Sequence, residues 1–414
     1  MKDNPREFDI VVVGATGFTG SLVTEYLCER YGIDASLRWA AAGRNEKKLA
    51  ALRDSLGAAA AELPLIVADT LDTESMRDLA KRTRVVLTTV GPYARYGSEV
   101  VAACAANGAH YCDLAGEVQW IRRMIDAHAD TARQSGARIV HCCGFDSIPM
   151  DIGAWFLQKE AKARYGDYCE SITLLVKAMK GGASGGTMAS MMNLMRETRA
   201  DREVARVLAR PYSLNPQGEQ RGPDVGDQRG IRFDTDAQSW TAPFIMASVN
   251  TRVVRRSHAL LGYPWGPAFR YHEAIRTGPG AGGWSRSAMI TAGLAGLVGL
   301  ASFGWSRSLL ERFVLPKPGT GPDAKARENG FFDLRQTGTL ADGRRIQSRI
   351  TGDRDPGYGS TSKMLAESAV CLALDDLDTG GGVLTPASAM AAPLIERLQA
   401  NAGLSFEILP GSYS

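Results

Sequence analysis

The chain has 414 residues, of which 44% are hydrophobic and 22% are charged, a composition typical of a folded protein with a sizeable core. The formal net charge is only +3 and the basic residues are interspersed with acids, which argues against nucleic-acid binding. Seven cysteines without zinc-ligand spacing favour reduced thiols in a cytoplasmic protein over a disulfide framework. The polar stretch 1–7 does not resemble a signal peptide.

Residues 9–141 alternate short apolar runs with longer segments of helical periodicity. Such alternation is typical of βαβ units, in which parallel strands are joined by helices. The sequence therefore predicts an α/β fold with a doubly wound parallel sheet of the Rossmann type. We expect its strands at 10–13, 37–42, 65–68, 85–90, 109–112 and 137–141.

The pattern changes after residue 144 and predicts a second, α+β domain with a mostly antiparallel sheet. We place the boundaries at 1–150 for the Rossmann domain, 151–355 for the second domain, and 356–414 for C-terminal helices and a strand that pack back on the Rossmann domain. A stretch rich in proline, glycine and charge, 211–236, is expected to be a loop. The further expected elements are helices at 148–163, 360–375 and 386–400, and strands at 171–179, 269–275, 331–340, 345–352 and 404–409.

The stretch "DIVVVGATGFTG", residues 9–20, takes a buried strand directly into three evenly spaced glycines and then into a helix. A tight turn lets a ligand approach bare backbone, and the helix N-terminus then offers N–H groups and a positive dipole end to phosphates. The spacing G-x-x-G-x-x-G differs from the common dinucleotide motif, but its place at the first strand–helix junction supports a pyrophosphate site. We assign to this site Gly14, Thr16, Gly17, Phe18, Thr19 and Gly20.

The end of the second strand, "AAAGRNEKK", should distinguish NAD from NADP. NAD sites place an acid there for the ribose 2′-hydroxyl, whereas NADP sites tend to use an arginine for the 2′-phosphate. Arg44 occupies this position, so the sequence predicts NADPH as the cofactor. After the third strand, Asp69 is a candidate for contact with the adenine, although an acid at a strand end also often caps the next helix.

The fourth strand ends in "VVLTTVGPYARYG". In doubly wound sheets, ligands lie beyond the carboxyl ends of the strands. We therefore expect Val90, Gly91 and Pro92 to shape a turn at the cofactor, and Tyr93 and Tyr96 to face the nicotinamide.

Two more polar clusters, "YCDLAGE" and "CCGFDSIPMD", lie at expected strand ends. Asp113 and Glu117 fit hydrogen bonding between domains at least as well as catalysis. Asp146 and Ser147 are either catalytic or caps of the helix that begins near Pro149. The five histidines form no cluster with carboxylates in the sequence, so no metal site is expected.

The ordered set "DIVVVGATGFTG", "AAGR", "VVLTTVGPYARYG", "YCDLAGE" and "CGFDSIPMD" resembles saccharopine dehydrogenase-like oxidoreductases. The likeness continues through "NTRVVRRS", "PKPGTGP" and "GVLTPASAM", so it covers nearly the whole chain. Within that family the chain most resembles the trans-acting enoyl reductases of phthiocerol-type lipid synthesis. The resemblance implies an NADP-binding Rossmann domain, with Gly14, Gly17, Gly20 and Arg44 at the cofactor, and an α+β second domain. It gives no agreed catalytic residue.

The function that this resemblance implies is an NADPH-dependent reduction of an α,β-unsaturated thioester carried by an acyl carrier protein or by CoA, with a polyketide synthase as a partner. A donor is needed near the thioester oxygen, and Tyr93 and Tyr96 are the first candidates, followed by Asp146. We also expect a homo-oligomer.

Two alternatives remain open. One is a saccharopine-type dehydrogenase acting on an amino-acid imine, with Arg252, Arg255 and Arg256 as clamps for carboxylates, although "TRVVRR" reads equally well as a solvated strand end. The other is a lipid-surface protein that retains the nucleotide fold without catalysis.

The segment 287–306 contains no charged residue and is flanked on both sides by tryptophan and arginine. A helix of about 20 residues would be about 30 Å long, the thickness of a bilayer core. We expect it not to span a membrane, because the motifs after it resemble parts of the same folded unit. Its glycines at 293, 296 and 299 suit a helix that is closely packed, as in the wall of an acyl site, or one that lies peripherally on the inner face of the plasma membrane.

Overall fold

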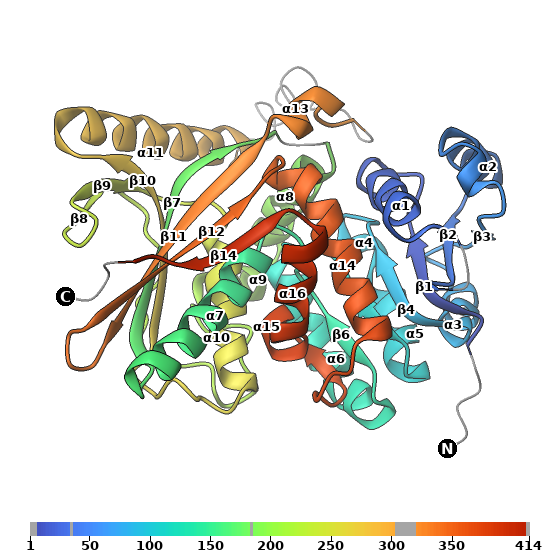
Figure 1. The fold of residues 1–414 in the computed structure, drawn as a ribbon, viewed down its shortest axis with the longest axis horizontal. Coiled ribbons are helices and arrows are strands. Elements are labelled where there is room, and N and C mark those ends of the chain that lie inside the picture. The colour runs from blue at the N-terminus through green and yellow to red at the C-terminus, as the bar shows by residue number, and fades with distance from the viewer. Residues whose placement is uncertain (1–5, 34–35, 183–184, 303–319, 411–414) are drawn as a thin grey trace. The chain divides into compact units, whose positions relative to one another are not determined.

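The computed structural model describes residues 6–33, 36–182, 185–302 and 320–410 (Figure 1). The chain folds into two compact units. The first unit combines Met1–Ile148 with Gly357–Ala402, and the second combines Pro149–Pro356 with Gly403–Ser414. The chain therefore leaves the first unit after Ile148, returns to it at Gly357, and passes into the second unit again at Gly403.

The sheet of the first unit consists of seven parallel strands in the order β13-β6-β5-β4-β1-β2-β3. Six of these strands follow the Rossmann order 3-2-1-4-5-6, which confirms the predicted fold class. The apolar strand β1 is buried along its whole length, as expected for a parallel sheet covered on both faces. The strands are β1 (Phe8–Val13), β2 (Trp39–Gly43), β3 (Leu65–Val67), β4 (Thr83–Thr88), β5 (His110–Cys112), β6 (Arg138–Val140) and β13 (Gly382–Leu384).

Two groups of helices pack against this sheet (Figure 1). In the first group, α5 contacts both α3 and α6. In the second group, α14 contacts α1 and α16 as well as β1, β4 and β5. A buried carboxylate, Glu367, joins α14 to α1 by accepting hydrogen bonds of 2.7 Å from the hydroxyls of Tyr26 and Tyr31. The helices are α1 (Phe18–Tyr31), α2 (Glu46–Ser55), α3 (Thr73–Arg82), α4 (Tyr93–Tyr96), α5 (Ser98–Asn107), α6 (Val118–Ser135), α14 (Thr361–Leu374), α15 (Pro386–Ala389) and α16 (Ala391–Asn401), with a 3-10 turn at Ala58–Ala60.

The second unit contains another seven-stranded sheet, in the order β14-β12-β11-β7-β10-β9-β8. All neighbours are antiparallel except β7 and β10, so the predicted antiparallel character is confirmed. The expectation that the last strand packs on the Rossmann domain is wrong, because β14 pairs with β12 from Ser348↔Ile408 to Gly352↔Leu404. The strands are β7 (Cys169–Lys180), β8 (Arg232–Asp234), β9 (Ser239–Ala242), β10 (Arg270–Gly278), β11 (Phe331–Leu340), β12 (Arg345–Gly352) and β14 (Leu404–Ile408).

Helices α7 and α10 pack together in this unit, and a hydrogen bond from the Ser257 hydroxyl to the buried Asp151 carboxylate joins them. The close approach of α7 to the sheet requires Gly153, where a Cβ would lie 2.3 Å from the Ile350 side chain. The helices are α7 (Ile148–Tyr165), α8 (Gly185–Ala200), α9 (Arg202–Ala209), α10 (Ala247–Leu260), α11 (Gly280–Ser302) and α13 (Ala324–Glu328).

Helix α11 carries most of the uncharged segment, whose last residues, 303–306, lie outside the described residues. It lies against β9 and β10 and leaves a broad apolar surface in solvent, with Met289 68% and Trp284 49% exposed. This exposure makes α11 a surface helix of the second unit. No helix in the described part of the chain has the length and hydropathy required to cross a bilayer.

Candidate functional site: the carboxyl edge of the parallel sheet

The glycine loop between β1 and α1 is built from close backbone contacts. Gly14 has a φ of +86°, which glycine adopts readily, and a Cβ on it would lie 2.5 Å from Cγ2 of Val90. A Cβ on Gly20 would lie 2.1 Å from the carbonyl oxygen of Gly14, so only glycine lets α1 start this close to the strand. At Gly17 a Cβ would meet only the Gly14 oxygen, at 3.3 Å. Gly14 and Gly20 are therefore required by close packing of the backbone. Gly17 lacks a side chain on the outer side of the loop, so that side remains open to a ligand.

The N-terminus of α1 suits an anion. Its N-cap is Gly17, no side chain among the described residues caps it, and its first turn contains no acidic residue. Thr16 and Gly17 are exposed, while Phe18 and Thr19 are half-buried. The first N–H groups of a helix have no intrahelical partner, so this end presents donors and a positive dipole to a phosphate. The residues present therefore fit the pyrophosphate of a dinucleotide.

Arg44 follows β2 directly and is exposed. The next residue, Asn45, caps α2 by accepting the N–H of Lys48 at 3.0 Å, so the cap does not engage the arginine. Among the described residues the Arg44 guanidinium has neither an ion pair nor a hydrogen bond. The Thr16 hydroxyl lies 3.7 Å from the Cβ position of Gly43, so the glycine loop borders this strand end. An uncommitted guanidinium at this place fits the 2′-phosphate of NADP.

Asp69 is half-buried in the loop that follows β3, and its carboxylate accepts the N–H of Leu71 in the same loop at 3.1 Å. The alternative that Asp69 caps the following helix is wrong, because Asp72 caps α3 by accepting the N–H groups of Glu74 and Ser75. Contact between Asp69 and the adenine stays a prediction.

The turn at residues 90–92 leads from β4 into the short helix α4 and contains a cis peptide bond before Pro92. The buried carboxylate of Glu117 holds the start of α4, accepting the N–H groups of Tyr93 at 2.7 Å and Ala94 at 3.0 Å. The carboxylate thus takes the place of an N-cap side chain and fixes the turn expected to face the cofactor.

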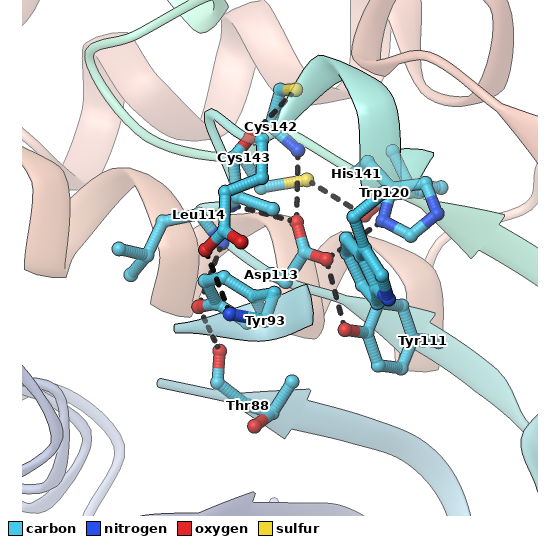
Figure 2. A network of polar contacts seen from close by, with 12 residues as sticks. Thr88, Tyr93, Tyr111, Asp113, Leu114, Trp120, His141, Cys142 and Cys143 are labelled. Atoms are coloured by element: carbon cyan, nitrogen blue, oxygen red, sulfur yellow. Dashed lines mark hydrogen bonds and ion pairs between the residues drawn. The ribbon is translucent and has the colours of Figure 1, made fainter. Parts of the chain in front are cut away.

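The two candidate tyrosines differ sharply. The Tyr93 hydroxyl is buried, donates to the carbonyl oxygen of Thr88 at 3.1 Å and accepts the N–H of Leu114 at 3.4 Å (Figure 2). Burial, and then the nearby Asp113 charge, raise the pKa of Tyr93 well above its ordinary value. The prediction that Tyr93 donates to a substrate is therefore not supported, because its proton is already committed to the backbone. Tyr96 is half-buried, and its hydroxyl has no hydrogen bond within the described residues.

Asp113, directly after β5, is the centre of a buried polar network (Figure 2). Its Oδ2 accepts the Tyr111 hydroxyl at 2.8 Å and lies 2.7 Å from His141 Nδ1, while its Oδ1 accepts the N–H groups of Ala115 and Cys142 at 3.0 Å. All these partners belong to the first unit, so the expected bonding between domains is wrong for Asp113. The network joins the ends of β5 and β6 at the edge where the ligand is expected.

His141 is a site residue that residue type and spacing did not predict, because Asp113 lies 28 residues before it in the chain. The signal was its position: His141 follows β6 and Asp113 follows β5, and these strands are neighbours in the sheet. His141 Nε2 is buried without a hydrogen-bond partner in the described part of the chain. Within those residues no three histidine, cysteine, aspartate or glutamate side chains are grouped to hold a metal ion.

Asp146 lies between β6 and α7 on the same edge. Its carboxyl is half-buried and has no hydrogen bond within the described residues, and burial raises its pKa to about 6. The next residue, the buried Ser147, has a φ of 142°, which strains a residue with a Cβ by about 1–3 kcal/mol. Such strain is often found at functional sites, and a carboxyl with a pKa near neutrality can deliver a proton.

The "TRVVRR" stretch is neither a strand nor solvated, because it lies within α10 and its arginines are buried. Arg252 pairs with Asp227 at 2.8 Å and Arg255 pairs with Asp224 at 2.6 Å, while Arg256 donates to a backbone carbonyl. These arginines hold on the helix the stretch 211–231, which is a loop as predicted, whereas the end of the predicted 211–236 loop contains strand β8. Their charges are therefore committed to the protein and do not form an open clamp for substrate carboxylates.

Comparisons with known proteins agree with this geometry. Residues 10–140 match the family model of the saccharopine dehydrogenase NADP binding domain. A trans-acting enoyl reductase of Mycobacterium ulcerans is 41% identical over 96% of this chain and 97% of its own, and one of Mycobacterium leprae is 39% identical over the same shares. A Mycobacterium tuberculosis protein grouped with these reductases is 44% identical over 98% of this chain and 99% of its own.

Among solved structures, apo saccharopine dehydrogenase (L-Glu forming) of Saccharomyces cerevisiae matches 97% of this chain and all of that one, with a TM-score of 0.51 and 12% identity, which shows a shared fold. The NADP-binding domain and the full-length relatives make this protein an NADP-dependent oxidoreductase. The chain belongs to the saccharopine dehydrogenase-like oxidoreductases, in the group that includes the trans-acting enoyl reductases.

Proposed function

We propose that this protein is a trans-acting enoyl reductase that reduces the C2–C3 double bond of an enoyl thioester held on an acyl carrier protein. The observation that carries the proposal is its similarity to trans-acting enoyl reductases over 96–98% of the chain, which includes both units. The arrangement at the carboxyl edge of the first sheet supports it, because the Tyr96 hydroxyl and the Asp146 carboxyl at that edge have no hydrogen bond within the described residues.

NADPH, when bound, supplies the hydride that reaches the β-carbon of the substrate. Negative charge then develops on the thioester oxygen, and the Tyr96 hydroxyl is the donor proposed to stabilise it. The α-carbon needs a proton, and the Asp146 carboxyl, whose pKa is about 6, is the proposed source. Glu117 and Asp113 act indirectly, because they fix the backbone around these groups.

The exposed surface of α11 supports an apolar substrate or environment. Met289 and Trp284 lie in solvent on a helix without charge from Ser287 to Ser302, and apolar surface of this kind commonly marks a contact site. Peripheral contact with the inner face of a membrane, a carrier protein of a polyketide synthase as partner, and a homo-oligomer are further parts of the proposal. Flotation with vesicles of neutral and anionic lipids tests the first part: the protein should float with vesicles, and a Met289→Lys variant should float less.

The direct test is turnover of purified protein. With NADPH and enoyl thioesters of short and long acyl chains, on carrier protein and on CoA, NADPH absorbance should fall fastest with the long carrier-bound chain. Saturated thioesters of the same lengths are the matched controls and should give no turnover. Turnover with lysine and 2-oxoglutarate derivatives in place of enoyl thioesters would instead support the imine dehydrogenase. Binding of NADPH with no turnover of any substrate would support a non-catalytic lipid-surface protein.

A further inference from the structure

The segment Gly357–Thr361, here called the return segment, brings the chain back into the first unit. Through Ser360 it forms a π-helical turn (Pro356–Ser360), and Thr361 begins α14. Turns of this kind are rare and occur frequently at functional sites. The α14 helix that it starts contacts β1, β4, β5 and α1, so the segment enters beside the strands that carry the cofactor loop.

One side of the return segment contacts the glycine loop. Tyr358 is 4% exposed, and its ring centroid lies 5.2 Å from that of Phe18, with the rings edge-on at 71°. Phe18 is the first residue of α1, directly after Gly17. The Tyr358 ring therefore fixes the Phe18 ring at the helix end that fits the pyrophosphate.

The other side of the return segment contacts the residues just before Asp146. The Thr361 hydroxyl accepts the N–H of Phe145 at 2.9 Å. The Thr361 methyl lies 3.1 Å from the position that a Cβ on Gly144 would occupy. Both Thr361 and Phe145 are buried, so removal of the Thr361 hydroxyl would take away an acceptor of the Phe145 N–H in the protein interior, where a lost hydrogen bond is costly.

We propose that the return segment is a positioning element with two separable tasks: Thr361 holds the backbone that aims the Asp146 carboxyl, and Tyr358 holds the Phe18 end of the cofactor loop. The first task rests on the proposed function of Asp146, whereas the second rests only on the NADP site. The return segment thus connects the proposed proton donor Asp146 with the glycine loop of the cofactor site.

The test compares matched variants at each position. Thr361→Val keeps the shape but removes the acceptor, and it should lower kcat about tenfold or more with NADPH affinity unchanged. The alkaline limb of its kcat–pH profile should move below the wild-type position near pH 6, because a loosened segment exposes the carboxyl to water. Thr361→Ser keeps the hydroxyl and should restore both kcat and the profile.

Tyr358→Leu should weaken NADPH binding several-fold, measured by fluorescence titration, with the pH profile unchanged, and Tyr358→Phe should retain wild-type binding because the ring is kept. If Thr361→Val does not fold, Gly144→Ala tests the same contact from the other side and should shift the pH profile. Equal loss of NADPH affinity in the Thr361 and Tyr358 variants, or Thr361→Val with the wild-type pH profile, would overturn the proposal. If no variant or wild-type protein reduces enoyl thioesters, the proposed function fails, while the NADPH titration of Tyr358→Leu still decides the second task.

Discussion

A carboxyl group buried in the second unit should make the free energy of unfolding depend on pH. Glu273 lies in the middle of β10 and is completely buried. Its Oε2 accepts the Asn250 amide at 3.0 Å, but its Oε1 has no hydrogen-bond partner in the described part of the chain. Burial raises its pKa to about 8 from an ordinary value of 4.5. The folded protein therefore keeps a proton that the unfolded chain releases near pH 4.5.

The direction of the pH effect follows from this raised pKa. The stabilising contribution of the protonated group is complete below about pH 4.5 and is lost as pH rises toward 8. Midway between these values each pH unit lowers the free energy of unfolding by about 1.4 kcal/mol. The slope is smaller close to either pKa, so raising the pH from 5 to 8 should cost about 3–4 kcal/mol. Glu273→Gln keeps the side-chain shape and cannot ionise, so the variant should gain about that much relative to wild type over this range.

Urea unfolding at pH 5 and pH 8, followed by tryptophan fluorescence, measures the effect for wild type and Glu273→Gln. Glu407→Gln is the matched control, because Glu407 is an exposed glutamate on β14 of the same sheet. The urea midpoint of Glu273→Gln should exceed that of wild type more at pH 8 than at pH 5, whereas Glu407→Gln should follow wild type. Equal pH dependence in Glu273→Gln and wild type would refute the reasoning.

Three further predictions concern the first unit. Arg44→Asp should weaken NADPH binding about ten- to a hundredfold and leave NADH binding nearly unchanged, because a charge-assisted bond contributes about 1.5–3 kcal/mol; equal native affinity for both cofactors would contradict this assignment. Tyr96→Phe should lower kcat on the order of a hundredfold with unchanged NADPH affinity if its hydroxyl stabilises the oxygen, and full activity would remove Tyr96 from the site. Glu117→Gln should lower the melting temperature and kcat together, because its carboxylate holds two N–H groups of α4; a variant with wild-type stability and activity would show that this cap is dispensable.

The sequence predicted the first unit well because its signals are local. The apolar run at β1, the glycines and the helical period after them lie within one short stretch, so the strand, turn and helix follow directly from residue types. The strand β13 could not be predicted in the same way. It consists only of Gly382–Leu384 and pairs with β6. In the chain these two strands are separated by Pro149–Pro356, which belongs to the second unit. Only pairing in space identifies so short a strand.

Part of the site could also be predicted from local signals. Strand ends locate Arg44, Tyr96 and Asp146 near the carboxyl edge, but residue type does not reveal which polar groups are already satisfied. Tyr93 was the first candidate, and its hydroxyl bonds depend on Thr88 and Leu114, which no local pattern relates to it. The burial of the α10 arginines could not be predicted, because the acidic partners of Arg252 and Arg255 lie in a loop more distant along the chain.

The central claim is that this protein transfers hydride from NADPH to the β-carbon of an enoyl thioester. The most direct measurement is mass spectrometry of the product formed by the purified protein from a carrier-bound long-chain enoyl thioester and NADPH deuterated at the transferred position. We expect a saturated acyl chain with one deuterium at the β-carbon. An unreduced enoyl chain, together with deuterium in a secondary amine product when an amino-acid imine is offered, would contradict it.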